Sequence, residues 1–131
     1  MRRVTDTNCF VAVALDEPER RWLVSIAGGC DLVAPPVLPY EIGNALSAQA
    51  RRGRLSPSEL IAAWDSATAI PVDLVSMNIR AASVMAGQLG IYAYDAYFLQ
   101  CAIEQQCPLL TLDRRLRRTA KQVDVQTLEG P

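Results

Sequence analysis

Short apolar segments alternate with longer amphipathic ones along this chain, and this alternation constrains the fold more than any other feature of the sequence. The apolar segments have the length of buried strands, and most are followed by apolar residues at helical spacing. Strands joined through helices run parallel, and a parallel sheet needs helices on both of its faces. The sequence therefore predicts an α/β fold. The strands are expected near residues 4–5, 31–34, 72–75, 108–112 and 123–127.

The length and composition predict one domain. A chain of 131 residues, 50% of them hydrophobic, can bury a continuous core. No linker, repeat or low-complexity segment divides it, so we expect a single domain over residues 1–131. No apolar run approaches the roughly 20 residues that a membrane helix needs. The residues after Arg2 and Arg3 lack the pattern of a secretory signal, so we expect a cytoplasmic protein without a membrane partner.

The sequence contains no histidine, which restricts the chemistry of any active site. Ser-His-Asp and Cys-His catalysis, and metal-free RNA cleavage by histidine pairs, all need an imidazole to move a proton near neutral pH. A zinc site would need all 4 cysteines from scattered positions, so we expect buried, reduced thiols instead. An enzyme of this composition must use carboxylates or a metal.

Four acidic residues are expected to face one crevice of the folded chain. Asp6 and Asp113 follow directly after two expected strands. Glu41 and Asp95 lie in the first turns of helices that come after strand-to-helix connections. Ligands of parallel sheets bind outside the carboxyl ends of the strands, where all four side chains can meet. Taken singly, each acid is more simply explained as a helix cap or a partner of the helix dipole.

Together, the four acids favour a metal site. Four carboxylates in one crevice repel each other and raise each other's pKa unless a cation neutralises them. Oxygen ligands select hard ions such as Mg²⁺ or Mn²⁺. The pattern therefore predicts a divalent cation at the carboxyl edge of the sheet.

Four segments around these acids resemble the acidic motifs of PIN-domain nucleases, in the order that the family has. They are Val4-Thr5-Asp6-Thr7-Asn8, Pro39-Tyr40-Glu41-Ile42-Gly43-Asn44-Ala45-Leu46, Tyr94-Asp95-Ala96 and Leu110-Thr111-Leu112-Asp113-Arg114. The resemblance covers nearly the whole chain and is strongest to the VapC-type toxins of type II toxin–antitoxin pairs. It implies a three-layer α/β/α fold with a five-stranded parallel sheet. It also implies a Mg²⁺- or Mn²⁺-dependent endoribonuclease, a homodimer, and a cognate VapB-type antitoxin whose tail covers the active site.

The resemblance also implies roles for individual residues. The catalytic, metal-binding acids would be Asp6, Glu41, Asp95 and Asp113. Thr7, Asn8 and Thr111 would orient carboxylates or metal-bound waters, although Thr111 is equally well explained as a β-branched strand residue. In this hypothesis a metal-activated water attacks the phosphodiester in line, which leaves 5′-phosphate and 3′-hydroxyl ends.

Two runs of arginine are candidates for RNA binding. The formal net charge of −1 gives no global sign of a nucleic-acid partner, so the distribution of charge matters more than its sum. Each run is more simply explained as a solvated helix face. The candidates for contacts with RNA phosphates are Arg51, Arg52, Arg54, Arg114 and Arg115.

Two other functions fit parts of the pattern. A haloacid dehalogenase-like phosphatase also has an Asp after its first strand, but it expects a second Asp two positions later, where this chain has Asn8. Its catalytic lysine is also hard to supply from Lys121, the only lysine. A non-catalytic RNA-binding or interaction module with the PIN fold is the second alternative. The sequence leaves the RNA target and the number of metal ions open.

Overall fold

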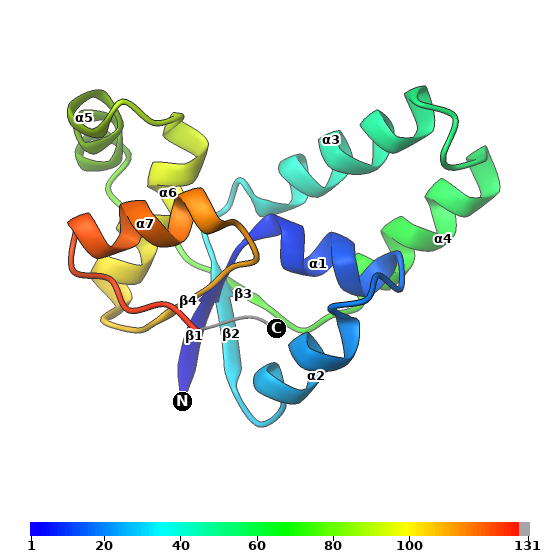
Figure 1. Ribbon diagram of the computed structural model, residues 1–131, viewed down its shortest axis with the longest axis horizontal. Helices are drawn as coiled ribbons and strands as arrows, with labels where there is room; N and C mark the ends of the chain where they lie inside the picture. Colours follow the sequence, from blue (N-terminus) through cyan, green and yellow to red (C-terminus); the bar gives the residue numbers. More distant parts are fainter. Residues whose placement is uncertain (129–131) are drawn as a thin grey trace.

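The structure, a computed structural model, describes residues 1–128 and has alternating strands and helices (Figure 1). The last three residues of the expected domain lie outside the described residues. The strands are β1 (Arg2–Thr5), β2 (Asp31–Ala34), β3 (Asp73–Leu74) and β4 (Leu109–Leu110). The helices are α1 (Thr7–Ala14), α2 (Arg20–Ala27), α3 (Leu38–Arg51), α4 (Pro57–Thr68), α5 (Ile79–Leu89), α6 (Ala93–Gln105) and α7 (Arg114–Gln122).

The strands form one parallel sheet in the order β3-β2-β1-β4, which confirms the expected α/β class. β1 is central, with Val4 paired to Val33 of β2 on one side and to Leu109 of β4 on the other. Parallel strands of one sheet place their carboxyl ends at the same edge. The chain therefore leaves β1, β2 and β4 at a common edge, and it enters α1, α3 and α7 from there.

The strand expected over residues 123–127 is reduced to a single bridge, and within residues 1–128 the sheet has four strands instead of five. Of residues 123–127, only Thr127 forms a bridge, to Leu109. Leu109 N donates to Gln126 O at 2.9 Å, and Leu128 N donates to Leu109 O at 3.2 Å. Asp124 has φ of 57°, a left-handed conformation that bends the chain away from an extended strand after α7. Pairing with β4 therefore begins too late to form a strand.

Helices cover both faces of the sheet, which confirms the three-layer arrangement. In Figure 1, α5, α6 and α7 lie to the left of the strands and α1 to α4 to the right. Successive strand residues point to opposite faces. Val4 and Leu109 belong to the core cluster that contains Phe98 of α6. Leu110, the next residue of β4, packs instead with Cys9 of α1.

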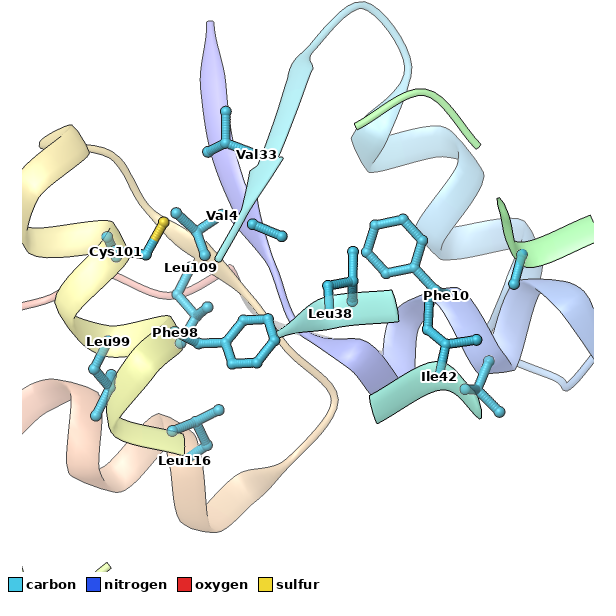
Figure 2. Close-up of a cluster of buried hydrophobic side chains, with 14 of the residues drawn as sticks. Val4, Phe10, Val33, Leu38, Ile42, Phe98, Leu99, Cys101, Leu109 and Leu116 are labelled. Carbon is cyan, nitrogen blue, oxygen red and sulfur yellow. The ribbon is translucent and has the colours of Figure 1, made fainter. Parts of the chain in front are cut away.

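The largest core cluster joins the sheet to helices on both sides. Figure 2 shows its side chains from β1, β2 and β4 together with residues of α1, α3, α6 and α7. Phe98 is 1% exposed and Leu99 is fully buried. Burial of side chains of this size contributes roughly 1.5–3 kcal/mol each, so α6 is held firmly against the sheet. The start of α6, which carries Asp95, is positioned by this packing.

Two further expectations concern the cysteines and the membrane. The four cysteines are free thiols, of which Cys9 and Cys101 are buried and Cys30 and Cys107 are half-buried. Within residues 1–128, the structure contains no helix with the length and apolar character that crossing a membrane requires.

Phe98 supplies a test of the core. We expect Phe98→Ala to lower the free energy of unfolding by about 3–5 kcal/mol, because the substitution leaves a cavity between α6 and the sheet. Ile61→Ala is the control, since Ile61 of α4 is 60% exposed and its loss should change stability by less than about 0.5 kcal/mol. Urea unfolding followed by circular dichroism measures both. Equal effects of the two substitutions would contradict the described core.

Candidate active site

Asp6 lies where the chain passes from β1 to α1, next to the centre of the sheet. It occupies the N-cap position of α1, yet its side chain forms no capping hydrogen bond. Its Oδ2 instead accepts a hydrogen bond of 2.7 Å from Thr111 Oγ1, and Asp6 is only 7% exposed. Burial raises the pKa of Asp6 to about 6, the Thr111 hydrogen bond opposes this rise, and the charge of Asp95 adds to it. Helix capping therefore does not explain Asp6.

Glu41 lies half-buried in the first turn of α3 and faces the same region as Asp6. Its Oε1 accepts a long hydrogen bond of 3.4 Å from Thr7 Oγ1. Burial raises the pKa of Glu41 to about 7, and the charges of Asp6 and Asp95 contribute to this rise. The structure thus brings together two acids that are 35 positions apart in the chain.

Asp95 and Asp113 lie close enough together for the charge of Asp113 to act on Asp95. Asp95 is half-buried in the first turn of α6, and its pKa is raised by burial and by the charge of Asp113, while Arg115 opposes the rise. Asp113 caps α7, because its Oδ1 accepts from Arg115 N at 2.8 Å and from Leu116 N at 3.3 Å. The capping explanation is therefore correct for Asp113, whose Oδ2 accepts no hydrogen bond from residues 1–128.

Thr111 connects two of the acids. Its buried hydroxyl donates to Asp6 and accepts a hydrogen bond of 3.0 Å from Asp113 N. Its carbonyl oxygen accepts from Arg117 Nε at 3.2 Å and from Arg117 Nη2 at 2.8 Å. Sequence reasoning missed Arg117, because a run of four arginines does not reveal which of them faces inward. The one usable signal is its position one helical turn after Asp113.

The charges of Asp6, Asp95 and Asp113 contribute to the raised pKa values of Asp6, Glu41 and Asp95, but the four acids form no closed metal cage. Among residues 1–128, no three acidic or cysteine side chains are arranged closely enough to hold one ion. Within the same residues the single ion pair joins Arg20 to Asp16 and includes none of the four acids. The oxygen donors of these acids, none of which forms an ion pair among residues 1–128, fit a hard divalent cation.

A hollow of about 400 Å³ adjoins Asp95 and Asp113. Arg115 and Tyr92 also line it. Its remaining lining consists of Gly90, Ile91, Leu116 and Thr119. The hollow thus combines acids, a cation and an aromatic surface directly beside the expected metal site.

The other candidate residues from the sequence differ in how close they lie to the four acids. Asn8 is exposed, and within the described part of the chain its side chain forms no hydrogen bond with the acids. Arg115 lines the hollow and Arg114 is exposed beside it. The cluster Arg51, Arg52 and Arg54 lies at the far end of α3, about 15 Å along the helix from Glu41. The structure therefore does not bring this cluster to the acids.

Three known proteins are similar to this chain in sequence or in structure. A curated relative, Ribonuclease VapC3 of Pyrobaculum aerophilum, is 28% identical over 121 residues, which is 88% of this chain and 92% of the relative. The solved structure of PAE2754 from Pyrobaculum aerophilum has a TM-score of 0.73 at 20% identity and covers 97% of this chain and 83% of that chain. VapBC2 from Rickettsia felis, solved with a DNA fragment from its promoter, has a TM-score of 0.69 at 11% identity over the full length of both chains.

The two structural likenesses establish the fold. The family follows from the sequence, because residues 3–122, most of the chain, match the PIN domain. This range contains all four acids, both buried threonines that contact them, and the hollow beside Asp95. With the parallel sheet and the acids at its carboxyl edge, this match shows that the chain belongs to the PIN domain family.

Proposed function

We propose that this protein is a Mg²⁺- or Mn²⁺-dependent endoribonuclease and the toxin of a VapBC-type toxin–antitoxin pair. The buried carboxylate of Asp6 carries the proposal, because it has acidic neighbours and forms no ion pair within residues 1–128. Such a group needs a proton or a cation at neutral pH. The name of the relative Ribonuclease VapC3 supports RNA as the substrate.

The proposed roles of the residues follow from their contacts. The metal ligands are Asp6, Glu41, Asp95 and Asp113. A divalent cation held by them would neutralise the cluster and lower the pKa of a water molecule for attack on a phosphodiester. Thr111 fixes the orientation of the Asp6 carboxylate, and Arg117 fixes Thr111 through its carbonyl oxygen. Thr7 restrains Glu41 through the weaker hydrogen bond.

The proposed partner is a VapB-type antitoxin. The uncompensated acids favour an antitoxin tail that carries an arginine or lysine, because a cationic side chain can replace the charge of the metal. The homodimer implied by the resemblance stays a prediction. The identity of the RNA is also open, since base specificity depends on the groove around the acids rather than on the acids themselves.

Removal of a metal ligand should abolish cleavage. We expect Asp6→Asn and Asp95→Asn to lower the rate of RNA cleavage more than about 100-fold, because each removes charge that holds the cation. Asp65→Asn, at an exposed position of α4, should leave the rate unchanged. Purified protein is incubated with total RNA plus Mn²⁺ or EDTA, and the ends of the products are mapped.

Hydrolysis by water should leave 5′-phosphate and 3′-hydroxyl ends. A 2′,3′-cyclic phosphate would exclude this mechanism. Cleavage that survives EDTA or Asp6→Asn would place the activity at another site. If the wild-type protein neither cleaves RNA nor binds Mn²⁺ in calorimetry, the protein is a non-catalytic module with the PIN fold.

Thr111 offers a test of carboxylate positioning. We expect Thr111→Val to weaken Mn²⁺ binding and cleavage about 10–100-fold, because Asp6 and Asp113 N lose their shared hydroxyl partner. Thr5→Val is a matched control, since the hydroxyl of Thr5 is also buried but has no hydrogen-bond partner among the described residues. Calorimetry and cleavage rates should therefore be unchanged in Thr5→Val. Equal effects of the two substitutions would refute the positioning role.

Without divalent cations, the stability of the protein should fall as the pH rises from about 4 to about 7. A carboxyl group whose pKa is raised on folding binds more protons in the folded than in the unfolded state, so deprotonation destabilises the fold. For Asp6, a rise from 3.8 to about 6 corresponds to about 3 kcal/mol at most.

Asp6→Asn should remove this loss, so in EDTA the variant should be more stable than the wild type at pH 7.5 and similar to it below pH 4. Urea unfolding at both pH values measures the difference. Addition of Mn²⁺ at pH 7.5 should stabilise the wild type and have a smaller effect on the variant. A wild-type protein that becomes more stable between pH 4 and pH 7 in EDTA would contradict the raised pKa.

A further inference from the structure

Tyr92 begins α6 at a position that usually carries a capping side chain. It is the N-cap of α6, yet it forms no side-chain capping hydrogen bond. Serine, threonine, asparagine and aspartate are the residues preferred there, because their side chains accept from the free N–H groups of the first turn. Side-chain capping bonds from Ser56, Asn78 and Asp113 begin α4, α5 and α7, whereas α1, α2, α3 and α6 begin without one. Among the uncapped helices, α6 is the one whose N-cap residue lines the hollow beside Asp95 and Asp113.

The backbone of Tyr92 is held firmly although its ring is 76% exposed. Gly90 ends α5 in a left-handed conformation with φ of 65°, which turns the chain toward α6. Ile91 packs against the core clusters on the inner side. The carbonyl oxygen of Tyr92 accepts from Asp95 N at 3.1 Å and from Ala96 N at 3.3 Å. The ring is therefore carried into solvent by a chain segment that is fixed on both sides.

The hollow beside Tyr92 matches the chemical parts of a nucleotide. Asp95 and Asp113, two of the proposed metal ligands, line the hollow. Arg115, which lines the hollow and whose charge acts on Asp95, carries a guanidinium group suited to a phosphate. Tyr92, which lines the same hollow and is largely exposed, carries an aromatic ring suited to a base. At about 400 Å³ the hollow is within the size range of ligand sites. Base, phosphate and metal can thus be engaged at neighbouring points of one surface.

Two other exposed tyrosines are less suitable for this role. Tyr94 is 55% exposed, but its ring already packs edge-to-face against Tyr97, with ring centroids 5.9 Å apart. Tyr40 is 80% exposed and precedes Glu41 on α3, outside the residues that line the hollow. Among the described residues, Tyr92 is the tyrosine that lines the hollow.

From these observations we infer that Tyr92 stacks on an unpaired base of the RNA substrate while Arg115 contacts an adjacent phosphate. A base inside a duplex has both faces covered by its neighbours, so a single exposed ring selects single-stranded segments or loops. The inference rests on the ribonuclease function proposed above and specifies its substrate class. It also explains why a poor capping residue begins α6, since the site gains a stacking surface where the helix loses a cap.

The test separates RNA recognition from helix stability. We expect Tyr92→Ser to raise the Tm by about 2–5 °C, because serine caps α6, and to weaken binding of unstructured 12-nucleotide RNAs about 10-fold or more. Tyr92→Phe keeps the ring and should bind within about threefold of the wild type. Ile79→Ala is the control, since Ile79 begins α5, is 61% exposed and lies outside the hollow. Fluorescence anisotropy with Ca²⁺ measures the affinities.

A chemical substitution in the RNA locates the contact. Replacing the stacked base by an abasic nucleotide should lower kcat/KM for the wild type. It should leave kcat/KM of Tyr92→Ser unchanged, because this variant has no ring on which the base could stack. A scan of abasic positions along a cleaved RNA identifies the base, and a fully paired RNA of the same sequence should show no dependence on Tyr92.

The outcomes distinguish this inference from the proposed function. Unchanged RNA affinity of Tyr92→Ser would overturn the inference, even if the wild-type protein cleaves RNA. Weaker binding in both Tyr92→Ser and Tyr92→Phe, or equal dependence on Tyr92 for paired RNA, would also overturn it. If the wild type cleaves no RNA but binds it through the ring of Tyr92, the inference stands as RNA recognition and the ribonuclease proposal fails.

Discussion

The parallel pairing of β1 with β4 is the constraint on which the rest of the site depends. Thr5 is in register with Leu110, and Asp6 N donates to Leu110 O at 3.0 Å. This register places Asp6 beside Thr111, so one hydroxyl can serve both Asp6 and the backbone of Asp113. A slip of one residue would turn the Thr111 side chain to the opposite face of the sheet. The active-site geometry is therefore a direct consequence of strand register.

The site is built from residues that oppose the stability of the fold. Asp6 is buried among like charges, so its ionisation at neutral pH destabilises the metal-free protein. Tyr92 begins α6 without a capping bond. By contrast, α4 begins with a complete capping box of Ser56 and Glu59. The departures at Asp6 and Tyr92 both lie near the carboxyl edge of the sheet, and such departures are typical of functional sites.

Much of the fold was predictable, and the failures have physical causes. Hydrophobic periodicity predicted the four strands of the sheet, because buried parallel strands need apolar residues whatever lies around them. It failed at residues 123–127, where the left-handed conformation of Asp124 interrupts an apolar pattern that otherwise suits a strand. Arg117 was missed for a related reason. Residue type predicts that an arginine is charged, whereas its contact with the Thr111 carbonyl depends on the orientation of α7.

The sequence by itself determined the chemistry available to this protein. The chain has no histidine and carries four acids where predicted strands pass into helices, so catalysis is restricted to carboxylates and the cations they bind. Residue types and their order along the chain are sufficient for this conclusion. Tertiary structure alone decided which acid is a cap and which is desolvated, and it placed Tyr92 and Arg115 in one hollow. Burial, pKa and proximity arise from packing between segments distant in the chain, and no local pattern encodes them.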